Sequence, residues 1–161
     1  MKKEKQVIIY TDGSALGNPG PGGYGVVLCF GPHQRELTGG YRLTTNNRME
    51  LLAAIKGLEA LTEPCRVTLY SDSRYVVDGI TKGWARRWRA NNWMRNKRER
   101  ALNVDLWAEL LELCEKHEVA FRWVKGHAGN AGNERCDQLA QGTAQLALLP
   151  VDENYAGGTP R

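Results

Sequence analysis

Three strand-like segments precede the first helical pattern of this chain, and this order constrains the fold more than any other feature. Residues 6–11, 24–30 and 36–43 are short and apolar, and Asp12-Gly13 gives a turn signal at the end of the first. Gly31-Pro32-His33 is a turn between the second and the third. Because short connections join antiparallel neighbours, these segments predict an antiparallel meander.

After the meander, helical and strand patterns alternate. The expected strands are residues 66–71 and 119–124, and the expected helices are residues 46–61, 74–80, 84–90, 103–116 and 133–146. The first helix carries apolar residues on most sides, so it should be largely buried. Strands separated by helices favour parallel pairing. The chain is therefore expected to adopt an α/β fold, with a mixed five-stranded sheet flanked by helices.

The chain of 161 residues suits one domain. We expect it to cover residues 1–149, followed by a flexible tail at 150–161. No apolar run reaches the roughly 18 residues of a membrane span. The apolar run 7–10 after the basic start is too short for a signal peptide, so a cytoplasmic location is expected. The four cysteines are scattered without zinc spacing, which favours reduced, buried thiols.

The positive charge of the chain is concentrated in one segment. Residues 82–100 hold eight basic residues and one acid, a net +7, whereas the whole chain carries +4, so the remainder carries −3. A basic arm on a slightly acidic body suggests a polyanionic partner. Its three tryptophans could form a small local core or meet that partner; they are Trp84, Trp88 and Trp93.

The segment 20–25 fits the pattern G-x-G-x-x-G literally but does not predict a dinucleotide site. That site requires the glycines to follow a strand and open a helix, whereas these glycines open a strand. We interpret the segment as a turn that brings the backbone close to another part of the molecule.

Four carboxylates hold the positions that matter most for chemistry. Asp12 and Asp72 end the first and fourth strands, Glu50 falls early in the buried helix, and Asp137 falls early in the last helix. If the two strands are parallel neighbours, Asp12 and Asp72 lie side by side, at the edge where open sheets bind ligands. Each also has an ordinary explanation, namely a turn, a helix cap, a capping box with Asn47, or a solvated helix position.

The four carboxylates together suggest a metal site. Clustered carboxylates repel one another unless protons or a cation neutralise them. All-oxygen ligands select hard ions such as Mg²⁺ or Mn²⁺. Two such ions about 4 Å apart can activate a water and stabilise a leaving oxygen on phosphorus. With the basic arm, this chemistry points to a nucleic-acid substrate.

Long motifs in order along the chain resemble type 1 ribonuclease H, most closely bacterial ribonuclease HI. The matching stretches are TDGSALGNPGPGGYG, TTNNRMELLAAI, YSDSRYVVDGI, NVDLW, WVKGHAG and GNERCDQLA, which lie between about residues 6 and 145. The resemblance implies the ribonuclease H-like fold with a basic protrusion at about 82–100. It also implies a four-carboxylate site at Asp12, Glu50, Asp72 and Asp137.

The resemblance implies further site residues. The loop histidine His127 would assist proton transfer or product departure, although a loop histidine alone is usually a surface residue. Asn18, Asn46 and Asn47 match positions that contact the minor groove of the hybrid, although they could instead cap helices and turns. Thr45 and Asn103 resemble a pocket for a phosphate of the DNA strand. The arm residues expected on the DNA strand are Trp84, Arg86, Arg87, Trp88, Arg89 and Trp93.

The chain departs from the family pattern at a few positions. Arg74 stands where glutamine is expected and is still assigned to substrate binding. Leu43 replaces the phosphate-pocket arginine of some relatives, with Arg42 one residue away, and Ala15 replaces a larger residue. These departures concern substrate contacts rather than chemistry.

We therefore expect a monomeric endoribonuclease that cuts the RNA strand of RNA–DNA hybrids with two Mg²⁺ ions, which Mn²⁺ can replace, leaving a 5′-phosphate and a 3′-hydroxyl. One alternative is another nuclease of the superfamily, such as an integrase or junction resolvase, which cleavage of duplex DNA would reveal. The other is a non-catalytic hybrid-binding module. A turnover assay with and without EDTA decides this alternative, because a binding module would not cut the hybrid in either case.

Overall fold

The computed structural model describes residues 5–126 and 129–155 of the chain. Three strands open the fold, and they are β1 (Lys5–Ala15), β2 (Gly20–Phe30) and β3 (His33–Thr44). The other two strands are β4 (Cys65–Ser71) and β5 (Glu118–Trp123). The helices are α1 (Asn46–Glu59), α2 (Arg74–Thr81), α3 (Trp84–Ala90), α4 (Val104–Lys116) and α5 (Ala131–Ala144).

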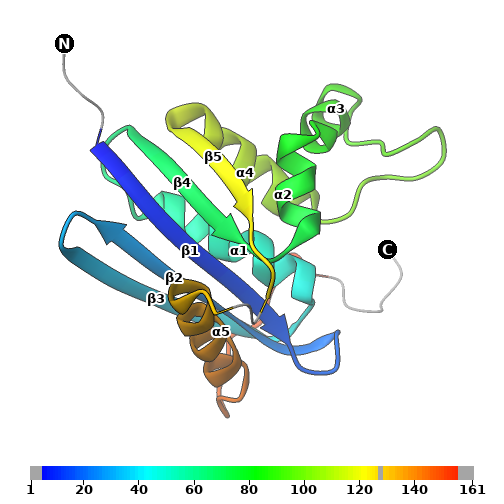
Figure 1. The fold of residues 1–161 in the computed structure, drawn as a ribbon. Helices are drawn as coiled ribbons and strands as arrows, with labels where there is room; N and C mark the ends of the chain where they lie inside the picture. The colour runs from blue at the N-terminus through cyan, green and yellow to red at the C-terminus, as the bar shows by residue number, and fades with distance from the viewer. Residues whose placement is uncertain (1–4, 127–128, 156–161) are drawn as a thin grey trace.

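The five strands form one mixed sheet in the order β3-β2-β1-β4-β5 (Figure 1). β1 pairs antiparallel with β2, and β2 pairs antiparallel with β3, as the meander predicted. β4 lies parallel to β1, and β5 lies parallel to β4. The expected α/β fold with a mixed five-stranded sheet is confirmed.

Helices cover both faces of the sheet, and the alternation of side chains along β1 shows how. Ile9 is fully buried and lies against Gly57 of α1, whereas the ring of its neighbour Tyr10 lies against Gly132 of α5. Consecutive strand residues point to opposite faces. Helices α1 and α5 therefore pack on opposite faces of β1, with α5 in front of the sheet in Figure 1.

Helix α1 is buried on nearly all sides because it lies between the sheet and α4. The apolar face of α4 that packs on it includes Trp107, Leu110 and Leu111, each at most 1% exposed. The expected buried helix and the expected amphipathic helix are both confirmed.

The basic arm consists of α3 and the loop that leads to α4. The loop folds back on itself through a bridge between Met94 and Arg100, and it projects from the body of the molecule (Figure 1). Trp88 and Trp93 are half-buried against the core, whereas Trp84 lies under the ammonium of Lys82. Two of the three tryptophans therefore attach the arm to the main core, whereas the ring of Trp84 contacts a lysine of the arm.

The start of the expected flexible tail is packed against the body. The backbone N–H of Arg42 donates to the carbonyl of Pro150, and Asp152 is buried in an ion pair with Arg48. A backbone hydrogen bond and a buried charge pair thus join the start of the tail to the body, whereas the domain boundary at residue 149 and the flexibility of the tail stay predictions. The remainder of that tail, residues 156–161, lies outside the described residues.

Two features bear on expectations about membranes and cysteines. No helix among the described residues is long and apolar enough to cross a membrane. The four cysteines form no disulfide in the part of the chain that the structure describes, and Cys136 is fully buried. Burial raises the pKa of the Cys114 thiol to about 11, which keeps it protonated and unreactive.

Candidate active site

Three carboxylates meet where the parallel half of the sheet ends. Asp72 directly follows β4, and Asp12 lies two residues beyond the last paired residue of β1 on that side, Tyr10. Glu50 reaches the same point from the first half of α1. One carboxylate oxygen from each of the three lies within 4.8 Å of the other two.

The strand β1 does not end at Asp12, so the prediction of a turn at Asp12-Gly13 is wrong. β1 continues to Ala15 because β2 continues beside it, and Asp12 pairs with Gly25. Only the neighbour on the other side, β4, has ended by this point. Asp12 is therefore a buried residue within a strand, with its side chain at the point where one flank of the strand has opened.

Glycines allow the helices to approach this point closely. A Cβ on Gly13 would lie 2.3–2.7 Å from backbone atoms of Met49 and Glu50, and a Cβ on Gly25 would lie 2.4 Å from the carbonyl oxygen of Cys136. The glycine-rich segment 20–25 is thus the start of β2, on which α5 packs. Its interpretation as a close backbone approach is confirmed, and its interpretation as a turn is wrong.

Glu50 is held by the strand rather than by its own helix. Its Oε1 accepts a hydrogen bond from the backbone N–H of Gly13, which rules out the capping box with Asn47. Thr45 is the N-cap of α1 and accepts from the N–H of Arg48. The other oxygen, Oε2, is buried and has no hydrogen-bond partner among the described residues.

Burial and mutual repulsion make this cluster resist full ionisation. Burial is the main cause that raises the pKa of Asp12 to about 7, and the charge of Asp72 adds to it. Burial, and then Asp12 and Asp72, raise the pKa of Glu50. The closeness of Asp12 and Glu50 itself acts in opposite directions on the two groups, lowering the pKa of Asp12 and raising that of Glu50.

The donor set fits a hard divalent cation. A buried carboxylate oxygen without a hydrogen-bond partner is costly, and a cation would satisfy it. A cation would also remove the repulsion that raises both pKa values. Oxygen-only ligands favour ions of the Mg²⁺ type over zinc or copper. The three residues are therefore suited to hold such an ion.

Asp137 lies on α5 beside this cluster but outside the group of three close oxygens. Both of its oxygens accept from the amide of Gln141, at 3.0 and 3.1 Å, and its closeness to Asp12 contributes to the raised pKa of Asp12. His127 lies outside the described residues. The residue before it, Gly126, is close to Asp72, since a Cβ there would lie 2.9 Å from Asp72 Oδ2.

The asparagines connect the turn after β1 to the start of α1. The N–H of Asn46 donates to Oδ1 of Asn18 at 2.9 Å, and Oδ1 of Asn46 accepts from the N–H of Ala15 at 2.6 Å. Asn47 is exposed on the same first turn of α1. Structural hydrogen bonds thus use the oxygens of Asn18 and Asn46, and their side-chain N–H groups have no hydrogen-bond acceptor among the described residues.

Arg48 joins the two residues of the expected phosphate pocket. Its backbone N–H donates to Thr45, and its Nη1 donates to Oδ1 of Asn103 at 3.3 Å. Asn103 has a left-handed backbone with φ 58° and donates to the hydroxyl of Tyr75. Arg42 is directed elsewhere, since its Nε donates to the carbonyl of Leu149. Arg42 therefore does not take over the role of the phosphate-pocket arginine that some relatives have at the position of Leu43.

The three arginines of the arm that were expected at the substrate, together with Arg95, divide into two pairs. Arg86 and Arg87 donate to backbone carbonyls of Ile80 and Lys82, at 3.5 and 3.0 Å. Arg89 pairs with Glu115, and Arg95 pairs with Glu99 within the arm. All four are exposed, so these contacts orient the side chains without burying them.

Trp123 is a residue of this region that the sequence analysis did not single out. It ends β5, its indole N–H donates to the backbone carbonyl of Asp72 at 3.0 Å, and its ring lies under the guanidinium of Arg74. An exposed tryptophan at the carboxyl end of a strand, inside the motif WVKGHAG, was the available signal.

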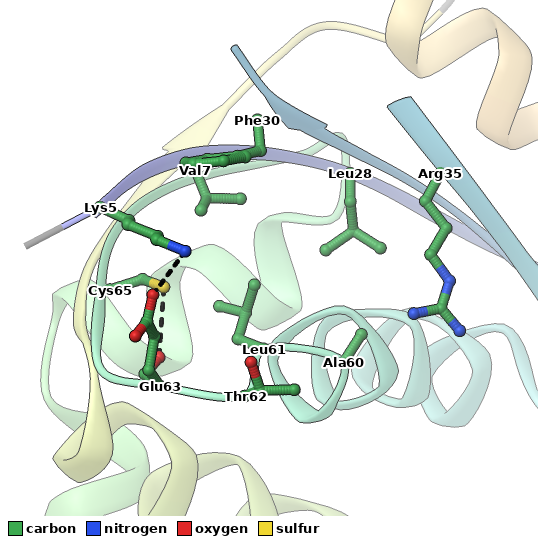
Figure 2. Close-up of a pocket in the computed structure, with 10 residues that line it drawn as sticks. All are labelled: Lys5, Val7, Leu28, Phe30, Arg35, Ala60, Leu61, Thr62, Glu63 and Cys65. Carbon is green, nitrogen blue, oxygen red and sulfur yellow. Dashed lines mark hydrogen bonds and ion pairs between the residues drawn. The ribbon is translucent and has the colours of Figure 1, made fainter. Parts of the chain in front are cut away.

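An apolar pocket among the described residues lies away from the carboxylates. Figure 2 shows it between the start of β1, the end of β2 and the end of α1, with Val7, Leu28 and Leu61 directed into it. Lys5 pairs with Glu63 at its rim. Because Lys5 and Asp12 lie toward opposite ends of β1, this pocket is remote from the carboxylates.

Comparison with known proteins identifies the family to which a chain with this site belongs. A family model described as RNase H matches residues 4–145. The ribonuclease H of Syntrophus aciditrophicus (strain SB) is 67% identical over 152 residues, which cover 94% of this chain and 88% of the relative. The ribonuclease HI of Synechocystis sp. (strain ATCC 27184 / PCC 6803 / Kazusa) is 56% identical, with 92% and 94% covered.

Solved structures agree with the sequence relatives. LC9-RNase H1, described as a type 1 RNase H with the type 2 active-site motif, is 35% identical with a TM-score of 0.80, covering 89% of this chain and 74% of that one. LC11-RNase H1 in complex with RNA/DNA hybrid is 27% identical with a TM-score of 0.64, covering 86% and 96%. With a model spanning most of its length and relatives more than half identical, the chain belongs to the ribonuclease H family, as a type 1 member and a metal-dependent endoribonuclease.

Proposed function

We propose that this protein hydrolyses the RNA strand of RNA–DNA hybrids with two Mg²⁺ ions, leaving a 5′-phosphate and a 3′-hydroxyl. The observation that carries the proposal is the meeting of Asp12, Glu50 and Asp72 within 4.8 Å, with a buried Glu50 oxygen that lacks a partner. The structure of a relative, LC11-RNase H1, in complex with an RNA/DNA hybrid supports the substrate class.

Asp12, Glu50 and Asp72 would hold the ions, and Asp137 would complete the site from α5. When bound, the ions supply Lewis acidity to the attacking water and to the leaving oxygen of an in-line displacement. The N–H of Gly13 orients Glu50, and the indole of Trp123 orients the backbone of Asp72. His127 is proposed to carry a proton during turnover, a role open to histidine because an unperturbed imidazole titrates at about pH 6.5.

Recognition of the RNA strand is assigned to the asparagines near the start of α1. The oxygens of Asn18 and Asn46 are occupied by structural hydrogen bonds, and their side-chain N–H groups have no acceptor among the described residues, so they can serve as donors to a ligand. Together with Asn47, they are proposed to contact the minor groove, where the 2′-hydroxyl distinguishes RNA from DNA. Replacing several consecutive ribonucleotides by deoxyribonucleotides should therefore stop cleavage at those positions.

Binding of the DNA strand is assigned to the other side of the site. Thr45 and Asn103, joined through Arg48, would grip one phosphate. The arm would follow the strand with Trp84, Trp88, Trp93 and its arginines. Because its charge is exposed, the arm should affect affinity and salt dependence more than the chemical step.

The deciding experiment is cleavage of a labelled hybrid by wild-type protein and by Asp72→Asn. With Mg²⁺, the wild type should cut only the RNA strand, and EDTA should stop it. The amide is a poor ligand for a hard cation, so Asp72→Asn should retain the fold by circular dichroism and lose nearly all turnover. Mn²⁺ should replace Mg²⁺ in the wild type.

Two outcomes would overturn the proposal. Efficient cutting of duplex DNA would instead indicate a resolvase-like nuclease, and tight hybrid binding without turnover would indicate a binding module. Mass spectrometry of the products tests the predicted ends. The monomeric state and the cytoplasmic location stay predictions, of which gel filtration with light scattering checks the first.

A further inference from the structure

Trp123 contacts two functional parts of the site at once. Its indole Nε1 donates to the backbone carbonyl of Asp72 at 3.0 Å, and the guanidinium carbon of Arg74 lies 3.8 Å from the centre of its ring. Trp123 pairs with Ser71 at the end of the β4–β5 ladder, and the N–H of Val124 donates to the carbonyl of Ser71. The sheet therefore fixes the backbone of Trp123, and the hydrogen bond to the carbonyl of Asp72 orients its indole.

The hydrogen bond to Asp72 acts where the strand has just ended. Asp72 lies between the last residue of β4 and Ser73, the N-cap of α2. Its own carbonyl is beyond the ladder, so the indole N–H replaces the strand partner that the sheet no longer supplies. Holding this peptide also limits where the Asp72 carboxylate can move, because the side chain departs from the same residue.

The stacking contact sets the direction of Arg74. Arg74 is exposed, and it forms no ion pair or side-chain hydrogen bond within the described residues, so its stack on Trp123 is the contact that orients it. A guanidinium lying flat on an aromatic ring keeps its N–H edge available, and that edge matches two oxygens of a phosphate. The charge is thereby held two residues from Asp72 with its donors open.

We propose that Trp123 is a positioning residue that couples the metal ligand Asp72 to Arg74, and that Arg74 contacts a backbone phosphate of the strand being cut. This inference rests on the proposed function, because the strand reaching the carboxylates must pass Arg74. It also gives a reason for arginine at a position where glutamine was expected: the stack turns a mobile cation into an oriented phosphate donor.

Three substitutions separate the two contacts. Arg74→Gln removes the charge and leaves the indole on Asp72. Trp123→Phe keeps an aromatic face for Arg74 but loses the N–H donor. Trp123→Leu loses both. Arg66→Gln is the matched control for lost charge, because Arg66 lies near the start of β4, exposed and paired with Glu118, far from Asp72 along the strand.

Each substitution should give its own signature. Arg74→Gln should raise KM about 3- to 10-fold, and should make the dependence of log K on log salt shallower by about 0.9, the loss of one phosphate contact. It should not weaken Mg²⁺ binding, because a nearby positive charge has been removed. Trp123→Phe should raise the Mg²⁺ concentration for half-maximal activity several-fold, with KM within about twofold of wild type. Trp123→Leu should show both effects, and Arg66→Gln neither.

Two measurements besides turnover keep the test independent of catalysis. Hybrid affinity is measured in Ca²⁺ by fluorescence anisotropy across a salt series, and Mg²⁺ binding is measured by calorimetry on the protein without substrate. Melting temperatures identify variants that are merely unstable. Wild-type protein that fails to cut a hybrid would contradict the proposed function itself. If the wild-type protein cuts the hybrid, two results would overturn this inference alone. Either Trp123→Phe and Arg74→Gln change the same parameter, or neither substitution changes any parameter.

Discussion

The buried carboxylate of Asp152 allows a loss of folding stability to be predicted in numbers. Arg48 is 3% exposed and lies between two carboxylates, with Nε 2.9 Å from Asp152 Oδ2 and Nη2 2.7 Å from Asp105 Oδ2. Asp152 is 5% exposed at its side chain, and Asp105 is 30% exposed. The hydroxyl of Thr44 also donates to Asp152. Asp152 is thus the more deeply buried partner and belongs to a segment that has no helix or strand.

Asp152→Asn should destabilise the protein substantially while leaving its shape almost unchanged. Removing one partner of a buried ion pair costs roughly 3–5 kcal/mol, because the other charge stays buried. Asp105 still pairs with Arg48, so we expect the low end, about 3 kcal/mol. For a domain of this size each kcal/mol lowers the Tm by about 2–4 °C, which gives a fall of about 6–12 °C.

Urea and thermal denaturation of the metal-free protein at neutral pH would measure the loss. Glu153→Gln is the matched control, since Glu153 is the exposed neighbour of Asp152 and should change stability by less than about 0.5 kcal/mol. In an Arg48→Met background, Asp152→Asn should cost much less, because no buried cation remains to be left unpaired. A Tm for Asp152→Asn within about 2 °C of the wild type would refute this reasoning and would support the prediction of a flexible tail.

Three further predictions concern the site and the arm. Because the folded pKa of Asp12 is raised to about 7 and that of Glu50 is also raised, the folded protein keeps protons that the unfolded chain has lost. The Tm without metal should therefore fall as pH rises from about 5 to about 8, and both Mg²⁺ and Asp12→Asn should lessen this fall. His127→Ala should slow turnover by about 10²–10⁴-fold without changing Mg²⁺ binding, and calorimetry showing lost binding would exclude a proton-carrying role. Replacing the four oriented arginines of the arm by alanine should raise KM and make the salt slope shallower by up to about 0.9 for each lost phosphate contact, with kcat within a few-fold; an unchanged slope in Ca²⁺ would mean that the arm serves solubility only.

Local patterns predicted the elements of the fold and the position of two carboxylates. The periodicity of residues 46–61 and 103–116 predicted the helices observed at α1 and α4. The prediction was possible because the buried sides of these helices carry apolar residues at helical spacing. Parallel pairing of the first and fourth strands predicted that Asp12 and Asp72 lie close together. This step needed only the order of strands and helices, which the sequence displays directly.

Contacts between distant segments were beyond the reach of such patterns. The end of β1 was placed too early because the ladder to β2, which carries the strand past Asp12, depends on pairing with another segment. The docking of Asp152 depends on Arg48, 104 residues away in sequence. The role of Trp123 depends on a hydrogen bond to a backbone carbonyl, and such a partner cannot be predicted from residue types because every residue has one. In each case the deciding partner is a non-local atom.

The position of the carboxylates follows from a change of pairing along one strand. β1 has an antiparallel neighbour that continues to its end and a parallel neighbour that stops at Ser71, so one flank of β1 is open beyond that residue. A carboxylate at Asp12 lies at this opening, where α1 brings Glu50 and the end of β4 brings Asp72. Because burial there penalises negative charge, the fold itself creates the demand for a cation. The same burial makes the metal-free site costly, and this cost explains why binding an ion should stabilise the protein as well as enable its chemistry.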